Sequence, residues 1–135
     1  MIVPLTPLSF LRRAVKLYGQ KIAVICGETR FTYAEFNGRA QRLSHCLDTL
    51  NIRRGEVVAF LSRNCHRLLE AYYGVTHTGA ILFPLNCRLA GDDFTYILNH
   101  SEAKLLFLSS EFIPVGASIR QFLRPDLRCI PLDDG

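Results

Sequence analysis

Four short apolar runs recur along the second half of the chain at nearly constant spacing. Their starts are 23 or 24 residues apart, and they cover Val57–Leu61, Ile81–Leu85, Lys104–Leu108 and Arg128–Leu132. Each run is apolar throughout its centre and does not alternate with polar residues, which is typical of strands covered on both faces. The intervals leave room for helices, so the pattern predicts strand–helix units joined by right-handed crossovers into a parallel sheet.

The segments between these runs carry apolar residues at helical spacing. His66–Thr78 has a broad apolar stripe, and Asp92–Asn99 has a narrower one. Both patterns are typical of helices that pack one face on a sheet. Glu111–Leu123 predicts a weaker helix, because Pro114 and Gly116 interrupt its first half.

The first half of the chain has a different arrangement. Pro7–Tyr18 predicts an amphipathic helix, and Ile22–Cys26 a strand that returns through Phe31 as a hairpin. Thr32-Tyr33-Ala34-Glu35 has the form of a capping box, with a hydroxyl at the N-cap and a carboxylate three residues later. The helix that it starts ends near Asn51. The whole pattern predicts an α/β protein of three layers, a mostly parallel sheet with helices on both faces.

Composition narrows the class of protein. A chain of 135 residues with 49% hydrophobic and 21% charged residues is typical of one globular domain. No apolar run reaches the ~18 residues of a membrane span. The amino terminus lacks the basic region of a secretory signal. The odd count of five cysteines, without a C-x-x-C pair, indicates reduced structural thiols. We therefore expect a cytoplasmic protein.

The charge balance does not indicate a nucleic-acid partner. The chain has sixteen basic and twelve acidic residues, a formal net charge of +4. The basic residues are scattered over predicted helix faces and loops, and no nucleic-acid-binding motif accompanies them. Solvated helix faces explain them better than a binding surface.

Glycine and histidine motifs yield no convincing catalytic or metal site. Gly74 and Gly79 have the spacing of a phosphate loop, but Ala80 follows where that loop requires Lys, so helix packing and a tight turn explain them better. Cys65, His66 and His77 match no metal-ligand spacing. We predict no catalytic residue and no metal site.

Other polar residues also have structural explanations. His45 lies beside Ser44 in a predicted helix, where neighbouring side chains point about 100° apart and form no nucleophile–base pair. Asn99-His100-Ser101 matches a glycosylation sequon, which we attribute to chance because nothing else indicates secretion. The acidic pair Asp92-Asp93 suits the start of its helix.

Two segments resemble core motifs of the adenylate-forming enzymes, which include acyl-CoA synthetases, luciferases and peptide-synthetase adenylation domains. FTYAEF (Phe31–Phe36) is similar to the first motif, and THTGAILFPLN (Thr76–Asn86) to the second. Asn86 followed by Arg88-Leu89 resembles the acyl-CoA synthetase branch. The similarity covers nearly the whole chain. It implies a single partial domain over residues 1–135, the start of the AMP-binding N-terminal domain, with the C-terminal domain absent.

The resemblance also implies a chemistry. Full-length members use ATP and Mg to convert a carboxylate, such as a fatty acid, into an acyl-adenylate, which then reacts with the thiol of CoA. Their phosphate loop and catalytic Lys lie beyond the region matched here, so we expect this fragment to bind none of these cofactors and to be inactive alone. Arg88 matches an Arg near the CoA phosphates of some ligases, although ordering of its own loop is an equal explanation.

Two alternatives remain open. In the first alternative, the chain is a non-catalytic interaction module or one half of a split ligase. It would then bind the missing remainder, or a second copy of itself, through an exposed sheet edge or an apolar face. A stand-alone nucleotide binder is the weaker alternative, because the sequence offers no phosphate-cradling loop.

Overall fold

Two helices and a hairpin form the amino-terminal part of the structure. The computed structural model describes residues 5–132. Helix α1 (Pro7–Tyr18) is followed by the antiparallel strands β1 (Ile22–Cys26) and β2 (Thr29–Thr32), and then by α2 (Tyr33–Thr49). The predicted capping box is confirmed. The Glu35 carboxylate accepts a hydrogen bond from the Thr32 N–H at 2.8 Å, and the Thr32 hydroxyl accepts one from the Glu35 N–H at 3.2 Å.

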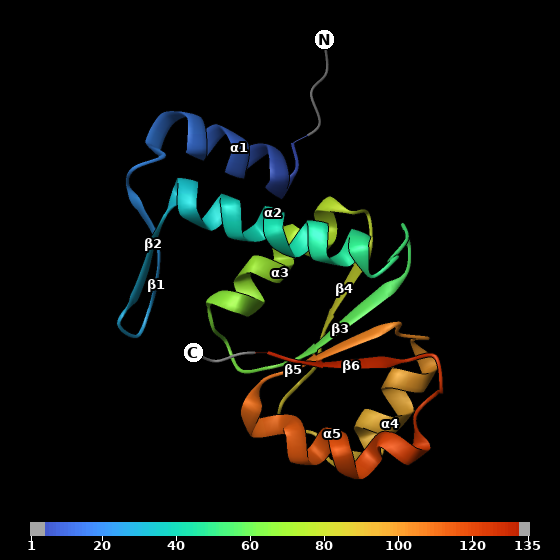
Figure 1. The fold of residues 1–135 in the computed structure, drawn as a ribbon. Helices are drawn as coiled ribbons and strands as arrows, with labels where there is room; N and C mark the ends of the chain where they lie inside the picture. Colours follow the sequence, from blue (N-terminus) through green and yellow to red (C-terminus); the bar gives the residue numbers. More distant parts are fainter. Residues whose placement is uncertain (1–4, 133–135) are drawn as a thin grey trace.

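A four-stranded parallel sheet forms the centre of the remaining chain (Figure 1). Its strands are β3 (Val57–Leu61), β4 (Ile81–Pro84), β5 (Leu105–Leu108) and β6 (Arg128–Pro131), in the order β4-β3-β5-β6. The four predicted strands are confirmed, each with ends within one residue of the predicted ones.

Helices cover both faces of this sheet, as predicted. Helix α3 (His66–His77) lies with α2 on one face, and α4 (Gly91–His100) lies with α5 (Ile113–Ile119) on the other (Figure 1). The fold is therefore the predicted three-layer α/β arrangement.

The two inner strands explain why the apolar runs do not alternate with polar residues. Val58 and Phe60 of β3 pack toward α2 and α3, whereas Ala59 and Leu61 pack toward α4 and α5. Residues of β5 divide in the same way. Because both faces are buried, every position of an inner strand has to be apolar.

The outer strands depart from the prediction. We expected all four strands to be covered on both faces, but β4 and β6 are exposed at both of their ends. Ile81 keeps 52% of its surface exposed. Each outer strand has only one hydrogen-bonded neighbour among the described residues, so both edges of this sheet are open.

The predicted weak helix Glu111–Leu123 is divided into three pieces. Short 3₁₀ turns over Ser110–Phe112 and Arg120–Phe122 flank α5. Pro114 lies in the first turn of α5, where its missing N–H costs nothing. Gly116 lets α5 approach β5 closely, because a Cβ there would lie 2.9 Å from a Leu108 methyl group. Within residues 5–132, no helix is long and apolar enough to cross a membrane.

Candidate functional site

The carboxyl ends of the parallel strands bring together the loops most suited to binding. From β3 the chain crosses through α3 to β4, and from β5 it crosses through α5 to β6 on the opposite side. The loops that follow β3 and β5 therefore diverge at neighbouring strands. In open parallel sheets, ligands bind in the crevice at such a switch point.

A hollow of about 540 Å³ opens at this carboxyl edge. Its lining comes from the loop after β3 (Ser62–Asn64), the end of β4 with its loop (Pro84–Arg88), and the side chains of Leu68, Tyr72 and Phe112. Two arginines and two asparagines are among the lining residues. We call this feature the carboxyl-edge hollow.

Arg88 presents a free guanidinium at the carboxyl-edge hollow. The Asn86 side-chain oxygen accepts a hydrogen bond from the Arg88 N–H at 3.1 Å, which fixes the loop after β4. The Arg88 side chain is exposed and has no hydrogen-bond or ion-pair partner among residues 5–132. The Asn86 side chain therefore orders the backbone of this loop at Arg88.

The other arginine of the hollow is held across the switch point. Arg63, which follows β3, donates from Nε to a Glu111 carboxylate oxygen at 2.8 Å, and Glu111 follows β5. Both side chains are exposed, at 77% and 40%, so this ion pair contributes little to stability. It balances one of the two positive charges and leaves Arg88 available for an anion.

Cys87 lies in the same loop but is not poised as a nucleophile. Its thiol donates to the Ser62 carbonyl at 3.1 Å. Burial raises the pKa of the Cys87 thiol, and the nearby Glu111 carboxylate raises it further. Because the thiolate is the reactive form, this environment disfavours Cys87 as a nucleophile.

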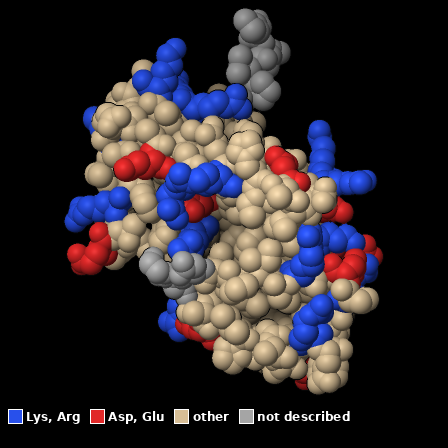
Figure 2. All heavy atoms as spheres, in the orientation of Figure 1, with Lys and Arg blue, Asp and Glu red and all other residues tan. Residues whose placement is uncertain are grey.

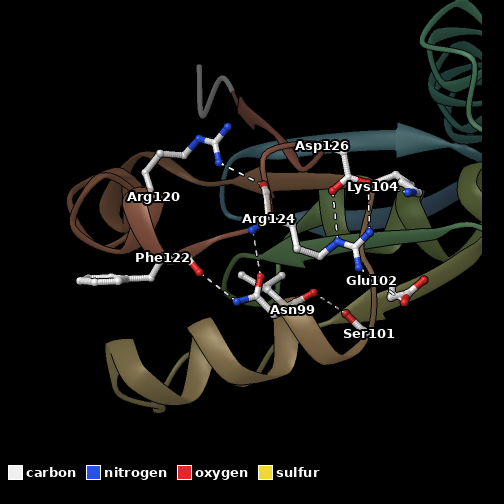
Figure 3. A network of polar contacts seen from close by, with 9 residues as sticks. Asn99, Ser101, Glu102, Lys104, Arg120, Phe122, Arg124 and Asp126 are labelled. Carbon is white, nitrogen blue, oxygen red and sulfur yellow. Dashed lines mark hydrogen bonds and ion pairs between the residues drawn. The ribbon is translucent and has the colours of Figure 1, made fainter.

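The amino edge of the sheet has a connected polar network (Figure 3). The Asn99 side chain, at the end of α4, donates to the Phe122 carbonyl at 2.9 Å and accepts from the Arg124 N–H at 3.0 Å. Asp126 accepts from Arg124 Nε at 3.1 Å and from Lys104 Nζ at 2.6 Å. These contacts hold α4 to the segments that enter β5 and β6.

Two residues of this network, Asn99 of the sequon and Asp126, have structural contacts that account for their polar side chains. The amide nitrogen of Asn99, to which a glycan would attach, already serves in the contact with Phe122. The hydrogen bonds from Arg124 and Lys104 hold the pKa of Asp126 well below its usual range. Both residues have structural roles.

The remaining motif residues are dispersed. Gly74 packs α3 on α2, because a Cβ there would lie 2.7 Å from the Ala40 carbonyl oxygen. Gly79 adopts φ +80° in the turn before β4. His66 and His77 lie at opposite ends of α3 and cannot share a metal ion, and no group of metal-ligating side chains occurs among residues 5–132.

One polar pair was missed by the sequence analysis. The Ser44 hydroxyl lies 3.3 Å from Nδ1 of His77, which is 33 positions away, whereas its sequence neighbour His45 is exposed. Ser44 is buried between α2 and α3, and among residues 5–132 no third group hydrogen-bonds to the imidazole, so the pair joins the two helices. Only the packing of α2 on α3 reveals it.

Comparison with known proteins shows the family to which this chain belongs. Residues 11–132 match the sequence profile of the AMP-binding enzyme family. The chain belongs to this family. A peroxisomal butyrate–CoA ligase of Arabidopsis thaliana is 42% identical over 122 residues, which are 90% of this chain and 21% of the ligase.

Solved structures of AMP-binding relatives have the same fold. An anthranilate CoA ligase, solved with anthranoyl-AMP, is 25% identical with a TM-score of 0.90 over 98% of this chain and 26% of its own. The N-terminal domain of FACL13 from Mycobacterium tuberculosis is 29% identical with a TM-score of 0.87, over 93% of this chain and 33% of its own. The chain thus spans about a fifth to a third of the length of these relatives.

Proposed function

We propose that this chain is the N-terminal scaffold of an ATP-dependent acyl-CoA ligase, with residues 1–135 forming one part of a larger AMP-binding domain. The proposal is carried by the family match over residues 11–132, together with relatives named as CoA ligases. The complete enzyme would join a carboxylate to AMP with release of pyrophosphate, and then transfer the acyl group to the thiol of CoA.

The described residues support a scaffold role rather than catalysis by this chain alone. Its three lysines are Lys16, Lys21 and Lys104, and none is among the residues that line the carboxyl-edge hollow. Lys21 lies over the Tyr18 ring at 4.8 Å, and Lys104 is paired with Asp126. No lysine is therefore placed to stabilise an adenylation transition state, and we propose that the chain is inactive by itself.

A chimaera tests the proposed function. This chain would replace the matching 21% of the Arabidopsis butyrate–CoA ligase, and carboxylate-dependent ATP–pyrophosphate exchange would be measured with butyrate and benzoate. We expect exchange by the chimaera and none above background by the chain alone. Exchange by the chain alone would contradict the scaffold role, and a folded but inactive chimaera would contradict the ligase assignment.

Arg88 is our candidate for contact with the phosphates of CoA in the complete enzyme. Its free guanidinium at the carboxyl-edge hollow supports this role, since a planar guanidinium matches phosphate oxygens. We expect Arg88→Gln in the chimaera to raise the KM for CoA about tenfold, the loss of one charged hydrogen bond. The rate of ATP–pyrophosphate exchange should not change.

An apolar surface supports docking of the remaining part of the ligase. Leu69 and Tyr72 of α3 are 40% and 48% exposed, and Ile25 of β1 is 61% exposed. Leu69 and Tyr72 also line a largely apolar hollow of about 670 Å³ beside the start of α1. Because the chain spans a fifth of its butyrate–CoA relative, we propose that the remainder covers this surface.

A second test concerns this apolar surface. The substitution Leu69→Glu with Tyr72→Glu should keep the isolated chain folded but abolish exchange by the chimaera. Sedimentation would show whether the isolated chain self-associates and whether the double variant prevents it. Full activity of the double-variant chimaera would contradict docking at this surface.

The acid substrate and the cellular location also belong to the proposal. Butyrate and anthranilate appear in the names of the relatives, so a fatty acid and an aromatic acid are both substrates to test. A cytoplasmic location stays a prediction, because the Arabidopsis butyrate–CoA ligase is named as peroxisomal.

A further inference from the structure

A separate hollow of about 260 Å³ lies between α2 and α3 and contains three arginines. Arg39 and Arg42 come from one face of α2, and Arg67 and Glu70 come from α3. We call these four residues the arginine hollow. It shares no residue with the carboxyl-edge hollow. Figure 2 shows basic side chains around an acidic one over α2 and α3.

Within residues 5–132, only one of the three guanidinium groups has an acidic partner. Arg39 Nε donates to a Glu70 carboxylate oxygen at 2.5 Å, and its guanidinium lies over the Phe31 ring at 4.6 Å. Glu70 is 7% exposed, so its charge needs this partner. Arg42 and Arg67 have no acidic partner among residues 5–132, which leaves two net positive charges in the hollow.

Arg67 is the less exposed of the two arginines of this hollow that have no described acidic partner. Its Nε is buried and has no hydrogen-bond partner within the described part of the chain, so an anion would contact the rest of this partly exposed side chain and not Nε. A buried donor on a permanently charged group is costly when it is unpaired, and such groups normally have a partner. Arg42 is exposed at the rim, where it is free to contact a ligand held by Arg67.

We propose that the arginine hollow binds a small oxyanion, a phosphate or a carboxylate group, through Arg67 and Arg42. A guanidinium forms paired, charge-assisted hydrogen bonds with the oxygens of either group. Arg39 is paired with Glu70 and forms part of the lining of the arginine hollow. The site is independent of the ligase assignment, because it rests on side chains outside the carboxyl-edge hollow.

Side-chain NMR tests this proposal on the 135-residue chain. The chain would carry Asp133→Asn and Asp134→Asn, which removes the two carboxylates that follow Leu132 in the sequence. The Nε–Hε signals of the arginines would be followed during separate titrations with inorganic phosphate and with citrate, at constant ionic strength set by chloride.

We expect the Arg67 and Arg42 signals to shift and saturate together. Arg42→Gln, an exposed change that keeps the fold, should weaken binding about tenfold. Arg13→Gln on α1 is the matched control and should leave binding unchanged. The anion that binds more tightly shows whether the site prefers a phosphate or a carboxylate group. Linear, unsaturated shifts with both anions, or equal binding by the Arg42→Gln variant, would overturn the proposal.

Discussion

The two ends of the parallel sheet use polar side chains in opposite ways. At the amino edge, hydrogen bonds and an ion pair connect polar residues from three segments of the chain, namely Asn99, Lys104, Arg124 and Asp126 (Figure 3). At the carboxyl edge, the loop is ordered by Asn86, and the Arg88 guanidinium has no partner in residues 5–132.

The two edges show two different roles for charged side chains at the surface. A charged group that is matched by its neighbours holds segments together, whereas an unmatched group beside a hollow is available to a ligand. In a parallel sheet, loops at the carboxyl edge diverge from neighbouring strands and leave that hollow open. Each edge therefore predicts its own response to mutation.

The largest effect on stability is expected at Asn99. Asn99→Ala removes two hydrogen bonds and leaves the Phe122 carbonyl and the Arg124 N–H unpaired. The free energy of unfolding should fall by about 1–3 kcal/mol, measured by urea denaturation. Asn64→Ala at the carboxyl edge is the matched control and should change it by no more than about 0.5 kcal/mol. Equal losses in the two variants would remove the distinction between the edges.

A smaller effect is expected at Gly79 in the amino-edge turn. Its φ of +80° and a Cβ that would lie 3.0 Å from Arg54 Cγ predict that Gly79→Ala costs about 1–2 kcal/mol. Gly27→Ala, with φ +59° and open space around its Cβ, isolates the backbone contribution. Thermal unfolding of both variants would measure the difference. A smaller loss for Gly79→Ala than for Gly27→Ala would contradict the tight turn.

Acid should weaken the amino edge selectively. The pKa of Asp126 is lowered in the folded chain, so its contribution to stability is present above about pH 4, the ordinary range of Asp, and is lost as the pH falls further. Asp126→Asn should therefore show a shallower fall in Tm between pH 5 and pH 3 than the parent chain. High salt should reduce this difference, because the carboxylate is exposed. Identical pH profiles would contradict a structural role for Asp126.

The smallest effect on stability is expected at Arg88. Because its side chain has no described partner, Arg88→Gln should leave the urea midpoint of the isolated chain unchanged within about 0.5 kcal/mol. A loss comparable to that of Asn99→Ala would show that Arg88 orders its loop after all.

The spacing of apolar residues predicted the fold well, because strand burial leaves a repeated apolar pattern and helix capping involves residues close in sequence. The runs at Val57–Leu61 and Lys104–Leu108 needed burial on both faces, and the Thr32–Glu35 box satisfies a helix end within four residues. The exposure of Ile81 was not predictable. Whether an apolar strand is central or at an edge depends on strand order, which the spacing of runs does not determine.

The candidate site was predicted only in part. Arg88 was proposed through a resemblance, and only the fold shows that its side chain has no partner among residues 5–132. The pairing of Arg63 with Glu111 spans 48 positions and has no local signal. Ser44 with His77 and the unpaired Nε of Arg67 likewise depend on how α2 and α3 pack.

The most direct test of the account compares two variants of the ligase chimaera. Measurement of the KM for CoA and of Tm in Arg88→Gln and Asn99→Ala should separate the two edges. We predict a KM raised about tenfold at unchanged Tm for Arg88→Gln, and a lowered Tm at unchanged KM for Asn99→Ala. A parental KM for CoA in Arg88→Gln would contradict the assignment of the carboxyl edge to ligand binding.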